Sequence, residues 1–131
     1  MELLDAYIEE LIQDTHLDEF NIRDMQLKLP GIKHKWAGRQ VRAKIELAKL
    51  KSKRFGLIDK LVDKLIEDSP VTLSRPTAQT RVIRHEVILS IDKQMEEFSH
   101  IITFLEKTDK TLSSMTFDIR NLTEIMKLET Q

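Results

Sequence analysis

Six apolar residues stand seven positions apart along the C-terminal half of this 131-residue chain. They are Ile91, Phe98, Leu105, Leu112, Ile119 and Met126. A spacing of seven returns to nearly the same side of an α-helix, so the pattern predicts an apolar seam that faces a partner helix. A second seam position is occupied by Ile88, Met95, Ile102, Met115 and Leu122. Its offset from the first changes near Thr108, so we expect two helices, over about 81–106 and 110–128, with a break between them.

The N-terminal half has helical periodicity too. Apolar side chains at positions 4, 7, 8, 11 and 12 predict an amphipathic helix over residues 3–14. Asp18 is suited to cap a short second helix, which should end before Pro30 because proline disfavours the helical conformation of the preceding residue. A long helix is expected over about 33–67, in which Trp36, Ala43, Leu50 and Leu57 are seven apart.

These patterns predict an all-α protein of long amphipathic helices with heptad seams. Three glycines and three prolines are too few for the many turns of a sandwich or barrel. Residues 69–80 combine two prolines with several hydroxyl side chains and no apolar period, which is typical of a linker or loop. We therefore expect one helical domain, 1–131, with a charged N-terminal part (1–68) and C-terminal oligomerisation helices (81–131).

The charge is distributed very unevenly along the chain. The net charge is only −1, but residues 1–25 hold eight acids and one arginine, and residues 33–54 hold nine bases and one glutamate. Those bases are Lys33, Lys35, Arg39, Arg42, Lys44, Lys49, Lys51, Lys53 and Arg54. A helix with charges of one sign repels itself unless an anion lies nearby, and a phosphate backbone would neutralise it and release counterions.

We predict that these nine residues bind DNA, with Trp36 stacking on an exposed base. Three alternatives stay open at this point. The bases can be an ordinary solvated helix surface, or they can pair with the acidic block within or between subunits. Trp36 can instead be the first seam residue of its helix and lie in the core.

The sequence contains only incomplete matches to catalytic and metal-binding motifs. His85-Glu86 begins like a zinc-protease helix, but Leu89 stands where the second histidine is needed. Glu97 and His100 have the spacing used in di-iron bundles, which require a second such pair. There is no cysteine and no glycine-rich phosphate loop. We expect a protein that is not an enzyme, with no catalytic residue, metal or cofactor.

No apolar run is long enough to span a bilayer and the N-terminus is acidic, so we also expect a cytoplasmic location.

The order of these features resembles the UvsY family of phage recombination mediators. The similarity runs through four stretches in the same order: Leu17-Asp18 up to Ile32-Lys33-His34-Lys35-Trp36, Lys44-Ile45-Glu46-Leu47 with Lys49-Leu50, Asp92 to Phe104, and Phe117-Asp118-Ile119-Arg120-Asn121-Leu122-Thr123-Glu124-Ile125. One element differs. The family's Lys-x-Arg element for DNA contact would fall near Asp59-Lys60-Leu61, which does not reproduce it. The DNA-contacting residues are therefore assigned from this chain's own charges.

The resemblance implies a ring-like homo-oligomer, of six or seven subunits, in the cytoplasm of the host cell if the protein is phage-encoded. Such a ring would bind single-stranded DNA, displace the single-strand binding protein and recruit a RecA-like recombinase. Its interface should use the C-terminal apolar residues, because so long a seam is expected to be more than a chain of this size can cover. These residues are Leu105, Leu112, Met115, Phe117, Ile119, Leu122, Ile125 and Met126. The competing hypothesis is a structural or adaptor coiled-coil protein that does not bind DNA directly.

Overall fold

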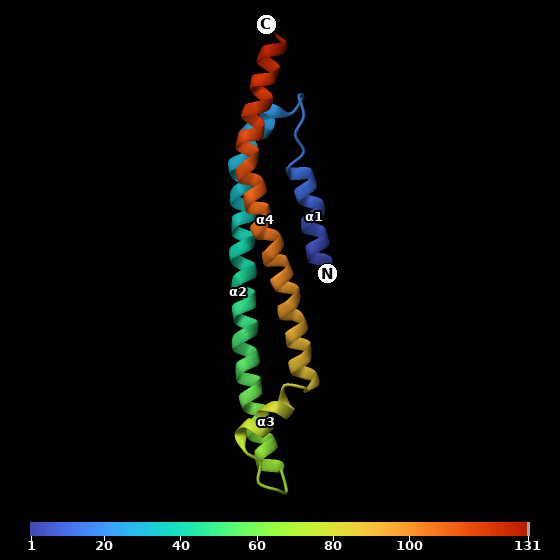
Figure 1. Ribbon diagram of the computed structural model, residues 1–131, viewed down its shortest axis with the longest axis vertical. Coiled ribbons are helices and arrows are strands. Elements are labelled where there is room, and N and C mark those ends of the chain that lie inside the picture. Colours follow the sequence, from blue (N-terminus) through green and yellow to red (C-terminus); the bar gives the residue numbers. More distant parts are fainter. Residues whose placement is uncertain (131) are drawn as a thin grey trace. The chain divides into compact units, whose positions relative to one another are not determined.

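The computed structural model describes residues 1–130, which form four α-helices and no β-strand. The helices are α1 (Glu2–Asp14), α2 (Ile22–Asp68), α3 (Arg75–Val82) and α4 (Glu86–Glu129) (Figure 1). The predicted all-α class is confirmed. The chain divides into two compact units, one made of residues 1–42 with the C-terminal residues from 100 onward, and one made of residues 43–99.

The first unit packs α1 and the N-terminal part of α2 with the C-terminal part of α4. The two long helices run antiparallel here: Lys33 Nζ donates to Thr116 Oγ1 at 3.1 Å, and the rings of Trp36 and Phe104 lie 6.3 Å apart. The buried apolar side chains come mainly from the seams of the long helices. They are Met25, Leu29, Trp36, Ile101, Leu105, Leu112, Met115 and Ile119.

Helix α2 continues through Pro30, so the predicted helix end before that residue is wrong. A proline inside a helix removes one backbone hydrogen bond and costs about 3 kcal/mol. Met25, Leu29 and Trp36 are all buried on either side of it, and ending the helix would remove them from the core. Burying each such side chain is worth roughly 1.5–3 kcal/mol, so the packing outweighs the proline.

Helix α4 is also continuous, and the predicted break at residues 108–110 is wrong. Thr108 does not cap a new helix. It is 1% exposed, and its Oγ1 donates to the Phe104 carbonyl oxygen at 2.9 Å, so its only polar side-chain group is satisfied within the helix. A threonine can therefore occupy a seam position between Leu105 and Leu112 without interrupting the packing.

The expectation that one chain is too small to cover the α4 seam is wrong as well. Leu105, Leu112 and Ile119 are each 4% exposed or less within the single chain. Helix α2 has 47 residues, and its first part lies along the C-terminal part of α4. Coverage of these seam positions therefore does not require another subunit.

The second unit consists of the rest of α2, helix α3 and the start of α4. Its core is formed by Val62, Ala78, Val82 and Ile88. Helix α3 lies partly in the segment 69–80 that was expected to be a linker or loop. Ser74 accepts the backbone N–H of Thr77 at 3.3 Å, and Pro76 stands in the first turn. A serine cap followed by an early proline is a helix-start signal, and burial of Ala78 and Val82 secures the short helix.

Within residues 1–130, no helix combines the length and the apolar character needed to cross a membrane.

Candidate nucleic-acid-binding surface

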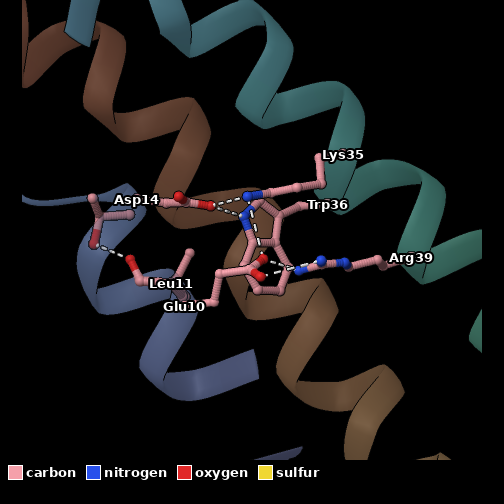
Figure 2. A network of polar contacts seen from close by, with 7 residues as sticks. Glu10, Leu11, Asp14, Lys35, Trp36 and Arg39 are labelled. Atoms are coloured by element: carbon pink, nitrogen blue, oxygen red, sulfur yellow. Dashed lines mark hydrogen bonds and ion pairs between the residues drawn. The ribbon is translucent and has the colours of Figure 1, made fainter. Parts of the chain in front are cut away.

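The nine predicted bases of α2 fall into three groups, and the first group, Lys35 and Arg39, is already paired inside the first unit. Helix α1 lies beside this part of α2 and supplies the anions (Figure 2). Lys35 Nζ is 3.2 Å from Glu10 Oε2 and 2.5 Å from Asp14 Oδ2. The guanidinium of Arg39 donates to both carboxylate oxygens of Glu10. The alternative in which the basic block pairs with the acidic block is therefore realised by Lys35 and Arg39 within one chain.

Trp36 lies at the centre of this cluster and is only 2% exposed. Its Nε1–H donates to Asp14 Oδ2 at 2.9 Å, and its ring meets that of Tyr7 edge to face at 5.5 Å. The Arg39 guanidinium stands 4.7 Å from the centroids of both rings. In this arrangement the indole offers no free face to a base, so the core alternative for Trp36 is the one the structure supports.

The ion pairs change how two of these groups titrate. The hydrogen bond from Arg39 outweighs partial desolvation and holds the pKa of the Glu10 carboxyl below its usual value. Burial lowers the pKa of Lys35, but hydrogen bonds to Asp14 and Glu10 more than offset it, so this pKa lies above its usual value. Helix α1 has no fully buried residue. Its attachment to α2 therefore depends strongly on this charged cluster.

The second group of bases lies on α2 in the second unit and faces solvent. Lys44, Lys51 and Lys53 are exposed, and none of them has an ion-pair partner among residues 1–130. Lys49 is 3.4 Å from Glu46, an exposed contact of little strength. Arg54 differs from its neighbours, because its Nε donates to Asp92 Oδ1 at 2.6 Å and ties α2 to α4. Of the predicted DNA-binding bases in this unit, the four lysines are thus the ones available to a phosphate.

The two remaining predicted bases belong to the first unit. Arg42 is exposed, with no ion-pair partner in the described part of the chain. Lys33 is half-buried and donates to Thr116.

Phe55 is an aromatic residue outside the predicted site. Its side chain is 72% exposed. It stands eleven residues after Lys44 and four after Lys51, so the three side chains leave the helix within about 40° of arc. An exposed ring beside lysines can stack on a base while they hold the adjacent phosphates. The signal was present in the sequence: Phe55 lies about 120–160° around the helix from Ala43, Leu50 and Leu57, on the side away from the seam.

The predicted oligomerisation residues differ in how far the fold buries them. Leu105, Leu112, Met115 and Ile119 are buried within the chain, and Leu122 and Met126 are half-buried. Phe117 and Ile125 are 62% and 52% exposed, and the neighbouring Leu128 is 71% exposed. These last three leave α4 within about 80° of arc, so they form one apolar strip on its outer side. Of the predicted set, Phe117 and Ile125 are the exposed members, and Leu128 extends the strip that they form.

The structure brings no metal-binding cluster together within residues 1–130, where no group of three or more acidic or histidine side chains converges. His85 has a structural task. Its Nδ1 accepts the backbone N–H of Val87 at 3.1 Å, which caps the start of α4.

No protein-family model matches this chain, and no curated protein matches its sequence. Solved structures do match: crystal structures of the bacteriophage T4 recombination mediator protein UvsY in lattice types IV and II each superpose with a TM-score of 0.81 at 15% identity. The match to the lattice type IV structure covers 96% of this chain and 98% of the UvsY chain. The match to the lattice type II structure covers 98% of each chain. Lattice type I gives a TM-score of 0.77, again at 15% identity, over 92% of this chain. The chain has the fold of UvsY. The likeness to UvsY noted from the sequence is thereby confirmed at the level of the fold.

The charged cluster on α1 predicts a specific pH dependence of stability. Replacing Glu10 by Gln should lower the free energy of unfolding at neutral pH by a few tenths to about 1 kcal/mol, because the ion pairs with Lys35 and Arg39 are lost. The pKa of Glu10 is depressed in the folded chain, so its contribution is complete above the ordinary value of 4.5 and disappears as the pH falls through the lower folded value. Urea titrations at several pH values measure the difference between the two proteins.

Glu9→Gln is the matched control, because Glu9 is exposed on the same helix and has no partner among the described residues. It should unfold like the wild type at every pH. A Glu10→Gln deficit that stayed constant down to low pH would contradict the assignment of this stability to the carboxylate.

Proposed function

We propose that this chain is a recombination mediator that binds single-stranded DNA as a homo-oligomer and helps to load a RecA-like recombinase in place of single-strand binding protein. The observation that carries the proposal is the fold shared over nearly the whole chain with UvsY, a protein described as a recombination mediator. The unpaired lysines on the solvent side of α2 are the second support. The proposed site of action is the cytoplasm of the host cell, if the gene is carried by a phage.

The proposed DNA-binding residues are Lys44 and Lys51, with Phe55 beside them on one side of α2, together with Lys49 and Lys53, which leave the helix on another side. Each lysine is a flexible point charge that binds a phosphate and reads no base. Phe55 adds stacking, which every base can provide because each has a π-face. Binding of this kind tolerates any sequence, as a mediator on arbitrary single strands requires. Lys35 and Arg39 are left out of the surface because α1 already neutralises them.

A single subunit with four phosphate contacts would bind weakly at physiological salt. In a ring of six or seven subunits one strand can meet several copies of the surface, and each further contact becomes effectively intramolecular. The proposed assembly surface is the exposed strip of Phe117, Ile125 and Leu128 on α4. In this proposal the N-terminal part, 1–68, carries the DNA surface and the C-terminal part, 81–131, carries the subunit contact. The proposed activity is non-covalent throughout and needs no catalytic residue.

The DNA surface is tested by replacing Lys44, Lys51 and Lys53 with Ala. Affinity for single-stranded oligonucleotides should fall to a similar degree for all sequences, and helicity should hold because alanine favours the helix. Each phosphate contact contributes about 0.7 to the slope of log affinity against log salt. The slope should therefore flatten by up to about 2, measured by fluorescence anisotropy from low to moderate salt.

A matched control removes three exposed lysines from α4, with Lys93, Lys107 and Lys110 changed to Ala. It has the same net charge but should retain most of the wild-type slope. Equal slopes for the two triple variants would show that binding responds only to net charge, and the assignment to α2 would be lost. If the wild-type protein binds no single strand even at low salt, the adaptor hypothesis is the better one.

Assembly is tested on the exposed strip of α4. Changing Phe117, Ile125 and Leu128 to Ser should leave the fold intact, because all three are exposed, and should yield monomers or small species. Sedimentation velocity measures the size. DNA affinity should fall by orders of magnitude although every lysine of α2 remains.

Two further variants separate assembly from folding. Ile119→Asp places a charge in the core and should unfold the first unit, whatever the assembly state. Changing the exposed residues Phe20, Leu27 and Val71 to Ser removes as many apolar side chains elsewhere and should leave the size unchanged. If this control dissociates the assembly and the strip variant does not, the subunit contact lies away from the C-terminal part of α4.

A further inference from the structure

A groove in the second unit lies between the end of α2 and the end of α3, away from the four lysines of the proposed DNA surface. Its volume is about 420 Å³, enough for one large side chain and part of a peptide backbone. Leu61, Leu65 and Val82 supply its apolar lining. Val82 belongs to the core of this unit, and the two leucines pack against that core. The floor of the groove is therefore held by the folded core and does not depend on a loose loop.

Cationic side chains surround this floor. Lys64, Arg81 and Arg84 line the groove, and all three are exposed. None of them forms an ion pair within the part of the chain that is described, residues 1–130. Asp68 is the one carboxylate among the lining residues. The rim consequently carries more positive than negative charge, and none of its three cations is ion-paired within residues 1–130.

At the other end of α3, an arginine of this unit is fully ion-paired within the chain. Arg75 donates to Asp63 at 2.9 Å and to Asp59 at 3.2 Å, so α2 supplies two carboxylates for one guanidinium. At the groove, the turns of α2 contribute Leu61, Lys64, Leu65 and a single carboxylate, Asp68. Among residues 1–130, Asp68 forms no ion pair with Arg81 or Arg84, so both guanidiniums are available to an anion of a partner.

The backbone that carries the two arginines is well fixed. The amides of Ile83, Arg84 and His85 donate to the carbonyl oxygens of Gln79, Arg81 and Val82 at 2.8–3.2 Å. His85 then caps α4 through Nδ1. The cations at the groove thus start from a preformed turn, which lowers the entropy lost on binding.

We propose that this groove binds an acidic peptide segment of a partner protein, in which one large apolar side chain is flanked by carboxylates. The apolar side chain would enter between Leu61, Leu65 and Val82. The flanking carboxylates would pair with Arg81, Arg84 and Lys64, and an arginine fork suits a carboxylate in two-point contact.

Charge alone would suit a nucleic acid as well, but the floor distinguishes the two ligands. Its three apolar residues are aliphatic and offer no flat face on which bases stack, and the one aromatic ring of the lining, His85, is engaged through Nδ1 with the backbone N–H of Val87. A phosphate backbone gains nothing from an apolar cavity between the cations. An apolar side chain with adjacent carboxylates uses both features of the groove. The proposal goes beyond mediator function and does not require that the chain bind DNA.

The test uses the full chain and a fluorescein-labelled peptide with one phenylalanine flanked on both sides by aspartates. Fluorescence anisotropy at fixed salt gives the affinity. Changing Arg81 and Arg84 to Ala should weaken binding by about three- to thirtyfold, the range expected for two exposed charge pairs. The double variant should fold normally, because both side chains are exposed, and a thermal melt checks this.

Three comparisons decide the outcome. A peptide with serine in place of phenylalanine should bind more weakly, and equal binding would overturn the role of the apolar floor. The double variant Lys44→Ala and Lys51→Ala, which removes the same charge from the proposed DNA surface, should bind the peptide like the wild type. The Arg81 and Arg84 variant should bind a labelled oligothymidine within about twofold of the wild type; a loss as large as that for the peptide would assign the groove to nucleic acid. Failure of DNA binding with intact peptide binding would count against the proposed function alone.

Discussion

The apolar seam of α2 determines where every charge on that helix can go. Seam residues such as Leu29, Trp36 and Ala43 must face the interior of their unit, and this fixes the rotation of the helix at each turn. Arg54 falls on the inner side and bonds to Asp92. Lys44, Lys51 and Phe55 fall outside it and remain exposed. A block of bases that looks uniform in the sequence is thereby sorted into structural cations and free ones.

Helix α1 further divides the bases of α2, because its carboxylates pair with two of them. Lys35 and Arg39 would be free cations on an isolated α2, but the carboxylates of Glu10 and Asp14 neutralise them, and Trp36 is enclosed between Tyr7 and Phe104. This cluster combines ion pairs, a hydrogen bond to the indole and ring contacts in one place. It engages two of the eight acids of residues 1–25 without a partner molecule. Part of the charge asymmetry is thus neutralised by ion pairs within the chain, and only the remaining part indicates binding to phosphates.

Much of the fold could be predicted from periodicity, because the seven-residue seams reflect directly which side of each helix is buried. The errors arose where a local signal competes with packing. Pro30 and Thr108 are both poor residues for a helix interior, yet each lies between buried seam residues whose burial outweighs the local cost. Ser74 and Pro76 signalled a helix start within a segment whose composition suggested a loop. The site was harder to predict, because the sequence contains the bases but does not show their partners. The aromatic residue bracketed by Lys35 and Arg39 is Trp36, which is buried, whereas Phe55 is the exposed ring.

The division of the α2 lysines into free and paired residues is the central claim, and lysine acetylation footprinting tests it most directly. The protein is treated briefly with acetic anhydride, with and without a single-stranded oligonucleotide, and modification at each lysine is measured by mass spectrometry. Lys44, Lys51 and Lys53 should react quickly in the free protein and become protected by the oligonucleotide. Lys35, held by Glu10 and Asp14, should react slowly in both samples. Rapid acetylation of Lys35 in the free protein, or protection of Lys35 while Lys44, Lys51 and Lys53 stay reactive with DNA bound, would contradict the account.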